Sequence, residues 1–144
     1  IVLLGSSGYS AELAGHLGLP FAFAHHFDMG GTLQALAIYR DSFNPSVVLS
    51  EPYAIVTASV LAAETDEQAA WFAAPGQLMR LAIRTGRFIP LMSPEDAARH
   101  PDLATARSMP TNQIIGTPDA AVARLESLAQ QTGANELMIA GFTH

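Results

Sequence analysis

The feature that most constrains this chain is the regular alternation of apolar runs with helix-forming segments. Four runs of strand length are almost entirely apolar, and the segments between them carry apolar residues at helical spacing. Near-continuous apolar strands that alternate with helices are typical of a parallel sheet covered by helices, because such strands are buried on both faces. The sequence therefore predicts an α/β fold with strands at 1–4, 21–26, 53–62 and 136–140.

Capping residues mark the predicted ends of the first two helices. A first helix over 11–17 is predicted to end at Gly18, where a C-terminal glycine is expected. Thr32 is predicted to cap a second helix, whose apolar period runs to Phe43.

The second half of the chain has clearer helix starts but a less regular middle. Thr65 and Gln68 form a capping box, and Pro75 is expected to kink or split the helix behind it. The stretch at about 85–112 is rich in proline and reads as an irregular insertion, in which the residues at 93–96 start one short helix. Thr117 and the proline after it predict the start of the last helix, which Gly133 ends.

Composition excludes several classes of protein. The chain has a hydrophobic fraction of 49%, a charged fraction of 14% and a net charge of −6. Without a basic patch the chain is not expected to bind nucleic acid. No run is long enough for a transmembrane helix, so no membrane partner is expected. The absence of cysteine favours a reducing compartment, and the protein is predicted to be cytoplasmic.

The length of 144 residues predicts one domain over 1–144. The chain starts at Ile1 within an apolar strand and stops soon after the strand at 136–140. Because a buried strand needs neighbours at both edges and covered faces, we expect this chain to be part of something larger.

The first strand leads into a Gly/Ser turn, and a helix follows at once. Ser6, Ser7, Gly8, Tyr9 and Ser10 occupy this connection. Free backbone N–H groups at such a turn, together with the positive end of the helix dipole, form an anion site that most often binds phosphate. The glycines of the turn are expected to allow positive φ and a close approach to a ligand. The alternatives are a tight turn without a ligand, and a Ser10 that caps the helix.

Five phrases are spread over nearly the whole chain: LGSSGYSA at 4–11, LGLPFAFAHHF at 17–27, LAIYRDSF at 36–43, IGTP at 115–118 and TGANELMI at 132–139. They resemble the bacterial luciferase-like flavin-dependent monooxygenases, in that family's order. That family folds as a (β/α)8 barrel, and the resemblance implies that this chain is its second half, roughly strands five to eight with their helices. Such a half-barrel is expected to self-associate or to pair with the missing half.

The resemblance gives the first turn a ligand. In the family the corresponding loop binds the phosphate of reduced FMN, which implies hydroxyl donors from Ser7 and Ser10. It also implies backbone N–H donors from Ser6, Gly8 and Tyr9. The alternative for Ser6 is a simple turn residue.

Two histidines, His25 and His26, end the second predicted strand, which places them at the rim of a barrel where the chemistry occurs. Adjacent strand residues point to opposite faces, so at most one of them faces the interior. By the family's pattern His25 is predicted to lie near the flavin ring and to be catalytic. The alternative is a rim histidine bonded to a carbonyl.

No metal is expected, because two adjacent histidines cannot both ligate from one strand and no third ligand is suitably spaced. Asp28 follows at the same rim and reads as a loop carboxylate.

The resemblance implies an enzyme that uses O2 and reduced FMN, supplied by a separate flavin reductase, to oxidise a small organic substrate. One alternative is an oxidoreductase of the same superfamily that uses the deazaflavin F420. The other is a non-catalytic half-barrel that binds flavin weakly or serves in assembly.

Overall fold

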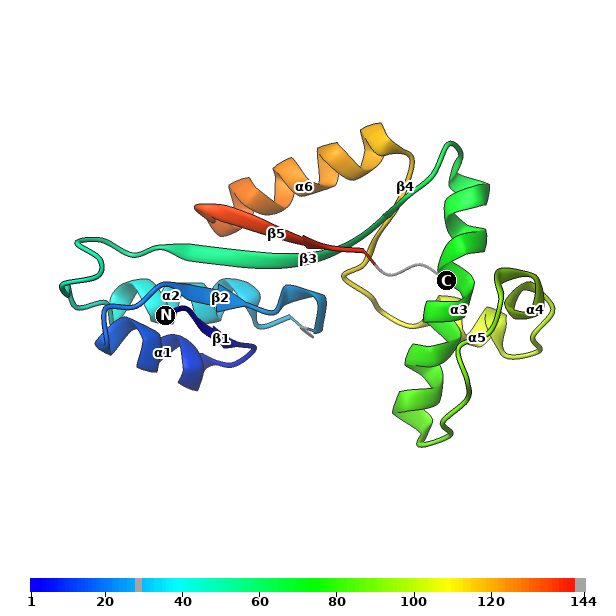
Figure 1. Cartoon of the computed structure of the whole chain (residues 1–144), viewed down its shortest axis with the longest axis horizontal. Coiled ribbons are helices and arrows are strands. Elements are labelled where there is room, and N and C mark those ends of the chain that lie inside the picture. Colours follow the sequence, from blue (N-terminus) through cyan, green and yellow to red (C-terminus); the bar gives the residue numbers. More distant parts are fainter. Residues whose placement is uncertain (28–29, 142–144) are drawn as a thin grey trace. The chain divides into compact units, whose positions relative to one another are not determined.

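Parallel strands organise the chain in the computed structural model, which describes residues 1–27 and 30–141 (Figure 1). Two units are distinguished. The first comprises residues 1–58 and 123–140, and the second comprises residues 59–122 with Gly141.

The sheet of the first unit is built around β3 (Ala54–Ala62), the longest strand. β1 (Leu3–Gly5) pairs in parallel with β2 (Phe21–Phe23), and β2 pairs in parallel with the start of β3. β5 (Glu136–Ala140) also pairs with β3. Asn135 fixes this last pairing, because its N–H donates to the Ala54 carbonyl at 2.9 Å and its side-chain oxygen accepts from the Ala54 N–H at 2.8 Å. The predicted α/β fold with a parallel sheet is confirmed.

One face of this sheet is covered by α1 (Gly8–His16) and α2 (Thr32–Asp41). Alternate strand residues point toward these helices, and Ala22 and Ile55 on the opposite face are buried as well, which is why the strands read as almost entirely apolar. The buried cluster on this face comprises Ala11, Ala14, Phe21, Phe23, Ala35, Leu36, Tyr39, Ala54 and Val56.

Tyr39 of α2 joins the helix layer to the loops that precede β2 and β3. Its side chain is fully buried, and its ring lies 5.4 Å from the ring of Phe21. Its hydroxyl accepts from the Tyr53 N–H at 3.0 Å and donates to the Leu19 carbonyl at 2.9 Å. Burial raises the pKa of the Tyr39 hydroxyl, so it keeps the proton that this second bond requires.

Arg40 ties the end of α6 (Pro118–Thr132) to α2. Its Nη2 donates to the carbonyls of Thr132 and Gly133, at 2.7 and 2.9 Å. These carbonyls have no acceptor role inside the helix, and a cation at a helix C-terminus is favourable. Gly133 has a φ of +57° and ends the helix as predicted.

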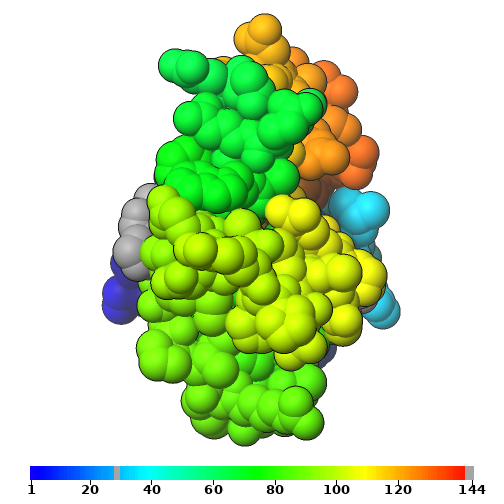
Figure 2. All heavy atoms as spheres, turned by 90° about the vertical axis from the view of Figure 1, so that its right-hand side faces the viewer, coloured from blue at the N-terminus to red at the C-terminus, as the bar shows by residue number. Residues whose placement is uncertain are grey.

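The second unit contains the far half of β3, which pairs in parallel with β4 (Ile114–Gly116). α3 (Asp66–Thr85) packs against the short helices α4 (Pro94–Ala98) and α5 (Leu103–Ser108). Figure 2 shows the surface that these three helices form, from green to yellow. Their shared core comprises Ala74, Leu78, Ala97, Leu103 and Ala106.

The predicted cap of α3 by Thr65 is confirmed, whereas Gln68 reaches back to the N–H of Glu64, one residue before the cap, rather than to that of Thr65. The Thr65 hydroxyl accepts from the Gln68 N–H at 3.1 Å, and Gln68 Oε1 accepts from the Glu64 N–H at 3.1 Å. The prediction that Pro75 could split this helix is wrong, since α3 is continuous from Asp66 to Thr85. Pro75 and its neighbours are buried, and packing of that face compensates for the missing backbone hydrogen bond.

Several predicted boundaries are also wrong by a few residues. The first helix begins at Gly8 rather than Ala11, because Ser7 caps it, and Gly31 rather than Thr32 precedes the second helix. The second helix ends at Asp41 and not at Phe43. The region at 85–112 holds two short helices, and β4 just after it was not predicted as a strand.

Among the described residues, no helix combines the length and apolar character needed to cross a membrane.

Replacement of Tyr39 by phenylalanine should lower the free energy of unfolding by about 1–3 kcal/mol, because the Tyr53 N–H and the Leu19 carbonyl lose a buried partner. Urea unfolding followed by circular dichroism measures this. Tyr9→Phe is the matched control: its side chain is 76% exposed, and a change within ~0.5 kcal/mol is expected. Equal unfolding midpoints for Tyr39→Phe and the control would contradict this role of the hydroxyl.

Candidate functional site

The connection between β1 and α1 is closed by two serines. Ser7 is the N-cap of α1, and its hydroxyl oxygen accepts from the Ser10 N–H at 3.4 Å. The Ser10 hydroxyl donates to the Ser7 carbonyl at 2.9 Å. The alternative interpretation of Ser10 as the helix cap is therefore wrong, because Ser7 holds that position and Ser10 braces the turn from inside the helix.

This turn presents backbone donors outward. The first helical bond in α1 runs from the Ala11 N–H to the Ser7 carbonyl, so the N–H groups before it have no acceptor within the helix. Ser6, Ser7 and Tyr9 are exposed, and the Ser7 hydroxyl lies 3.3 Å from the Ser10 hydroxyl, to which it can donate its proton. Unpaired N–H groups at the positive end of a nine-residue helix favour an anion.

The two glycines of the turn serve close packing rather than positive φ. Gly5 and Gly8 are absent from the glycines with positive φ, so that part of the prediction is wrong. A Cβ on Gly5 would collide with the side chain of Ser10, and one on Gly8 would lie 3.0 Å from Ile38 Cδ1. Glycine at these positions lets Ser10 fold back against β1 and lets α1 approach α2.

The two histidines lie in a short 3₁₀ turn, η1 (His25–Phe27), and not in a strand. The predicted strand to His26 is therefore wrong, since β2 ends at Phe23. The turn is closed by the Phe27 N–H, which donates to the Ala24 carbonyl at 3.1 Å. The Ala24 N–H donates to the Gly5 carbonyl at 2.9 Å, so the histidine turn and the serine turn lie at the same end of the sheet.

Each histidine is held by a different threonine. His25 Nδ1 lies 2.7 Å from Thr32 Oγ1, at the start of α2. His26 Nδ1 lies 2.7 Å from the hydroxyl of Thr57 on β3. The two rings are thus oriented by separate elements.

The Thr57 hydroxyl also decides which nitrogen of His26 carries the proton. It donates to the Phe23 carbonyl at 3.2 Å. Because a hydroxyl has a single proton, Nδ1 of His26 must be the donor to Thr57, and Nε2 of the neutral ring keeps its lone pair. His26 therefore offers a proton acceptor at Nε2.

The two threonines also lie on different sides of the sheet. Val56 belongs to the core against α1 and α2, and Thr57, the next residue, points to the opposite face. His26 therefore belongs to the face turned away from the helices, whereas His25 contacts α2 through Thr32. From the sequence, His25 is expected to face inward; the geometry favours His26 for that direction, and the catalytic role of His25 stays a prediction.

Two aromatic side chains at this end of the sheet are unusually exposed. Phe27 is 75% exposed, with its ring centre 4.0 Å from that of His26, and Tyr9 is 76% exposed. Exposed aromatic rings beside polar groups are suited to contact a ligand. Phe27 was missed by sequence reasoning, although a bulky apolar residue directly after a strand end was a usable signal.

Within residues 1–27 and 30–141, no group of three or more His, Asp or Glu side chains could hold a metal ion. Asp28, interpreted as a loop carboxylate, lies outside the described residues.

No family model matches the chain. Two curated relatives align over almost all of it: the uncharacterized protein YvbT of Bacillus subtilis, 42% identical over 143 residues, and a luciferase-like monooxygenase of Escherichia coli K12, 37% identical over 146 residues. Each alignment covers 96% of this chain and 43% of the relative. The chain thus spans less than half the length of the curated relatives it matches.

The crystal structure of apo-MsnO8 matches with a TM-score of 0.88 at 32% identity, over 99% of this chain and 45% of that one. Two distant structures share the fold alone. One is a type II Baeyer–Villiger monooxygenase in complex with FMN (TM-score 0.55, 18% identity, 96% of this chain and 41% of that one). The other is a coenzyme F420-dependent tetrahydromethanopterin reductase from Methanopyrus kandleri (TM-score 0.61, 12% identity, 97% and 44%).

Strong identity to a named relative along almost the entire chain, together with the close structural match, leads to one conclusion: the chain belongs to the luciferase-like monooxygenase family.

Proposed function

We propose that this chain is the C-terminal half of a (β/α)8 barrel in a flavin-dependent monooxygenase, and that the turn at residues 6–10 binds the flavin phosphate. The observation that carries the proposal is the cluster of backbone donors before the first helical bond of α1. β1, β2, β3 and β5, in that order, are proposed as strands five to eight. The alignments, which cover 43% of each relative, support this assignment.

The proposed phosphate donors differ in the hydrogen bonds that they already make within the protein. The N–H groups of Ser6, Gly8 and Tyr9 precede the first helical bond, and the Ser7 hydroxyl must turn its proton from the Ser10 hydroxyl to a ligand. The Ser10 proton is given to the Ser7 carbonyl and must rotate to reach a ligand. The main role of Ser10 is therefore to stabilise the turn through its hydrogen bond to the Ser7 carbonyl. The donor set fits a phosphate, which needs several N–H and O–H groups converging on its oxygens.

Reduced FMN, delivered by a separate flavin reductase, is proposed as the cofactor, and it supplies the electrons with which O2 oxidises a small organic substrate. The protein's own residues hold the phosphate, orient the ring and exclude water. The structural neighbour that is a Baeyer–Villiger monooxygenase is in complex with FMN, which supports this choice. F420 is the second candidate, because another structural neighbour is an F420-dependent reductase.

The double replacement Ser7→Ala with Ser10→Ala should weaken FMN binding about tenfold or more, because two hydroxyl groups are lost from the phosphate turn. Titration of FMN fluorescence against the purified protein measures the affinity. Because Ser7 also caps a helix, Ser93→Ala is the matched control: it removes the cap of α4 and should leave FMN affinity unchanged.

Unchanged FMN affinity in the double variant would sink the proposed phosphate site. The same titration with F420 separates the two cofactors, since the proposed function requires tighter binding of FMN.

A catalytic role of His25 predicts that His25→Asn slows oxidation of bound reduced FMN by O2 about tenfold or more, because a positioned proton donor or acceptor is lost. Stopped-flow absorbance measures this rate without a known substrate. His26→Asn is tested in parallel, since its Nε2 is a proton acceptor on the opposite face. His16→Asn, exposed on α1, is the control. If only His26→Asn slowed the reaction, the role predicted for His25 would pass to His26.

Apolar side chains on β1 and β5 support a proposed pairing with a second half-barrel or with another copy. Leu4 is 64% exposed and Ile139 is 51% exposed, although both belong to strands of the sheet. Covering such surface is favourable by roughly 25 cal/mol per Å². Sedimentation velocity of this polypeptide alone should show association that Leu4→Ser with Ile139→Ser reduces. A monomer in the unaltered chain would contradict it.

Association that is equal with and without FMN, combined with no measurable FMN affinity, would favour the non-catalytic assembly module.

A further inference from the structure

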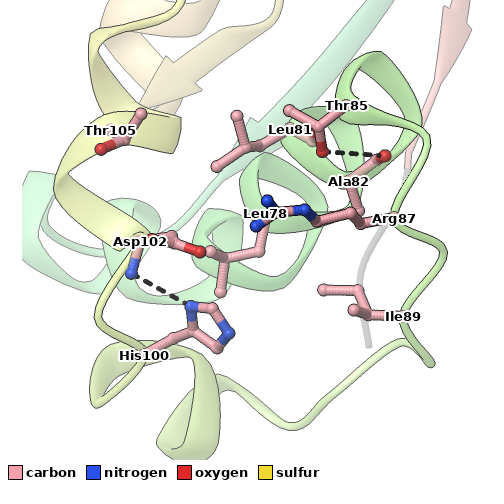
Figure 3. A pocket seen from close by; sticks show the side chains of 9 residues that line it. All are labelled: Leu78, Leu81, Ala82, Thr85, Arg87, Ile89, His100, Asp102 and Thr105. Carbon is pink, nitrogen blue, oxygen red and sulfur yellow. Dashed lines mark hydrogen bonds between the residues drawn. The ribbon is translucent and has the colours of Figure 1, made fainter.

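The second unit contains a pocket of about 270 Å³ that the proposed flavin site does not use (Figure 3). It is lined by α3, by the segment that leaves α3, and by the residues from His100 to Thr105. The volume lies just below the range of about 300–1,000 Å³ that is typical of ligand pockets, so only a small molecule would fit.

The walls of the pocket are mostly aliphatic. Leu78 is buried in the core shared by α3, α4 and α5, and Leu81 and Ile89 pack partly buried against the same core. All three line the pocket. These side chains provide an apolar surface for a hydrocarbon group, and their backing by a packed core keeps that surface in place.

Arg87, which follows the end of α3, brings a positive charge to this apolar pocket. Gly86 has a φ of +68° and ends the helix, and the Arg87 N–H donates to the Ala82 carbonyl at 2.9 Å. This left-handed cap fixes the backbone from which the Arg87 side chain extends. No hydrogen bond or ion pair of the Arg87 guanidinium occurs within the described part of the chain.

An anion lines the same pocket from the start of α5. Asp102 occupies the N-cap position, yet its carboxylate makes no capping hydrogen bond, unlike the side chains at the starts of α1, α3 and α4. Within the described part of the chain, no ion pair joins this carboxylate to Arg87. In Figure 3 the side chains of Arg87 and Asp102 both point toward the middle of the pocket.

His100 adds a neutral donor. Its Nδ1 accepts from the Asp102 N–H at 3.2 Å, so the proton of the neutral ring is on Nε2. The pocket thus combines an apolar floor with one cation, one N–H donor and one carboxylate, and the two charges do not satisfy each other.

We propose that this pocket binds a small zwitterion with an apolar group, the chemistry of an aliphatic amino acid. Its carboxylate pairs with Arg87 and His100, its ammonium group pairs with Asp102, and its hydrocarbon group covers Leu78, Leu81 and Ile89. Arg87 and Asp102 are both exposed, so a ligand with one charge would form only one of the two ion pairs that a zwitterion forms. The pocket therefore discriminates between a zwitterion and its singly charged analogues.

Isothermal titration with L-leucine, 4-methylpentanoate and 3-methylbutylamine tests this, because the last two lack the amine and the carboxylate respectively. Leucine should bind saturably, and each analogue should bind about tenfold more weakly or worse. Arg87→Met should weaken leucine about tenfold. Asp102→Asn should make leucine and 4-methylpentanoate bind equally. Arg99→Met is the matched control, since Arg99 is exposed, pairs with Asp96 and does not line the pocket.

No saturable leucine binding, or equal binding by the unaltered protein and Arg87→Met, would overturn the proposal. Equal affinity of the unaltered protein for leucine and 4-methylpentanoate would also overturn it, since Asp102 would then have no role. Thermal unfolding of each variant confirms that the fold is retained. The titrations are done without flavin, so their outcome is independent of the proposed function.

Discussion

Parallel pairing of β1 with β2, and of β2 with β3, is the constraint on which the first unit depends. Parallel strands end on the same side, so the connections that follow them meet at one edge of the sheet. The hydrogen bond from the Ala24 N–H to the Gly5 carbonyl joins these connections directly. Packing of Phe21 and Phe23 against α1 and against Tyr39 of α2 holds the pairing in register.

The site at that edge divides its chemistry between backbone and side chains. In the proposed phosphate site, the serine turn offers backbone N–H groups and a helix dipole, which need no proton transfer. In the histidine turn, Thr32 and Thr57 each orient one ring through a hydrogen bond of 2.7 Å. The orientation of each histidine ring therefore depends on one hydroxyl group.

The second unit relies on the long α3, whose apolar face organises two short helices. The Thr65 cap of α3 and the start of α4 are predictable from the sequence, because their signals lie within a few residues. For the sequence around Arg87 and Asp102, by contrast, only irregular structure is predicted. Their shared pocket depends on where α5 packs against α3, and that packing involves residues about twenty apart along the chain.

The sequence by itself determined the α/β class, the main strands, the serine turn and the starts of α3, α4 and α6, because apolar periodicity and capping residues act over a few positions. The exact end of β2 was not determined this way, since a 3₁₀ turn and a strand end share the same apolar pattern. Only the tertiary structure determined on which face of the sheet each histidine side chain lies. His26 meets Thr57, thirty-one residues away, through the parallel pairing of β2 and β3, and no local pattern encodes such a contact.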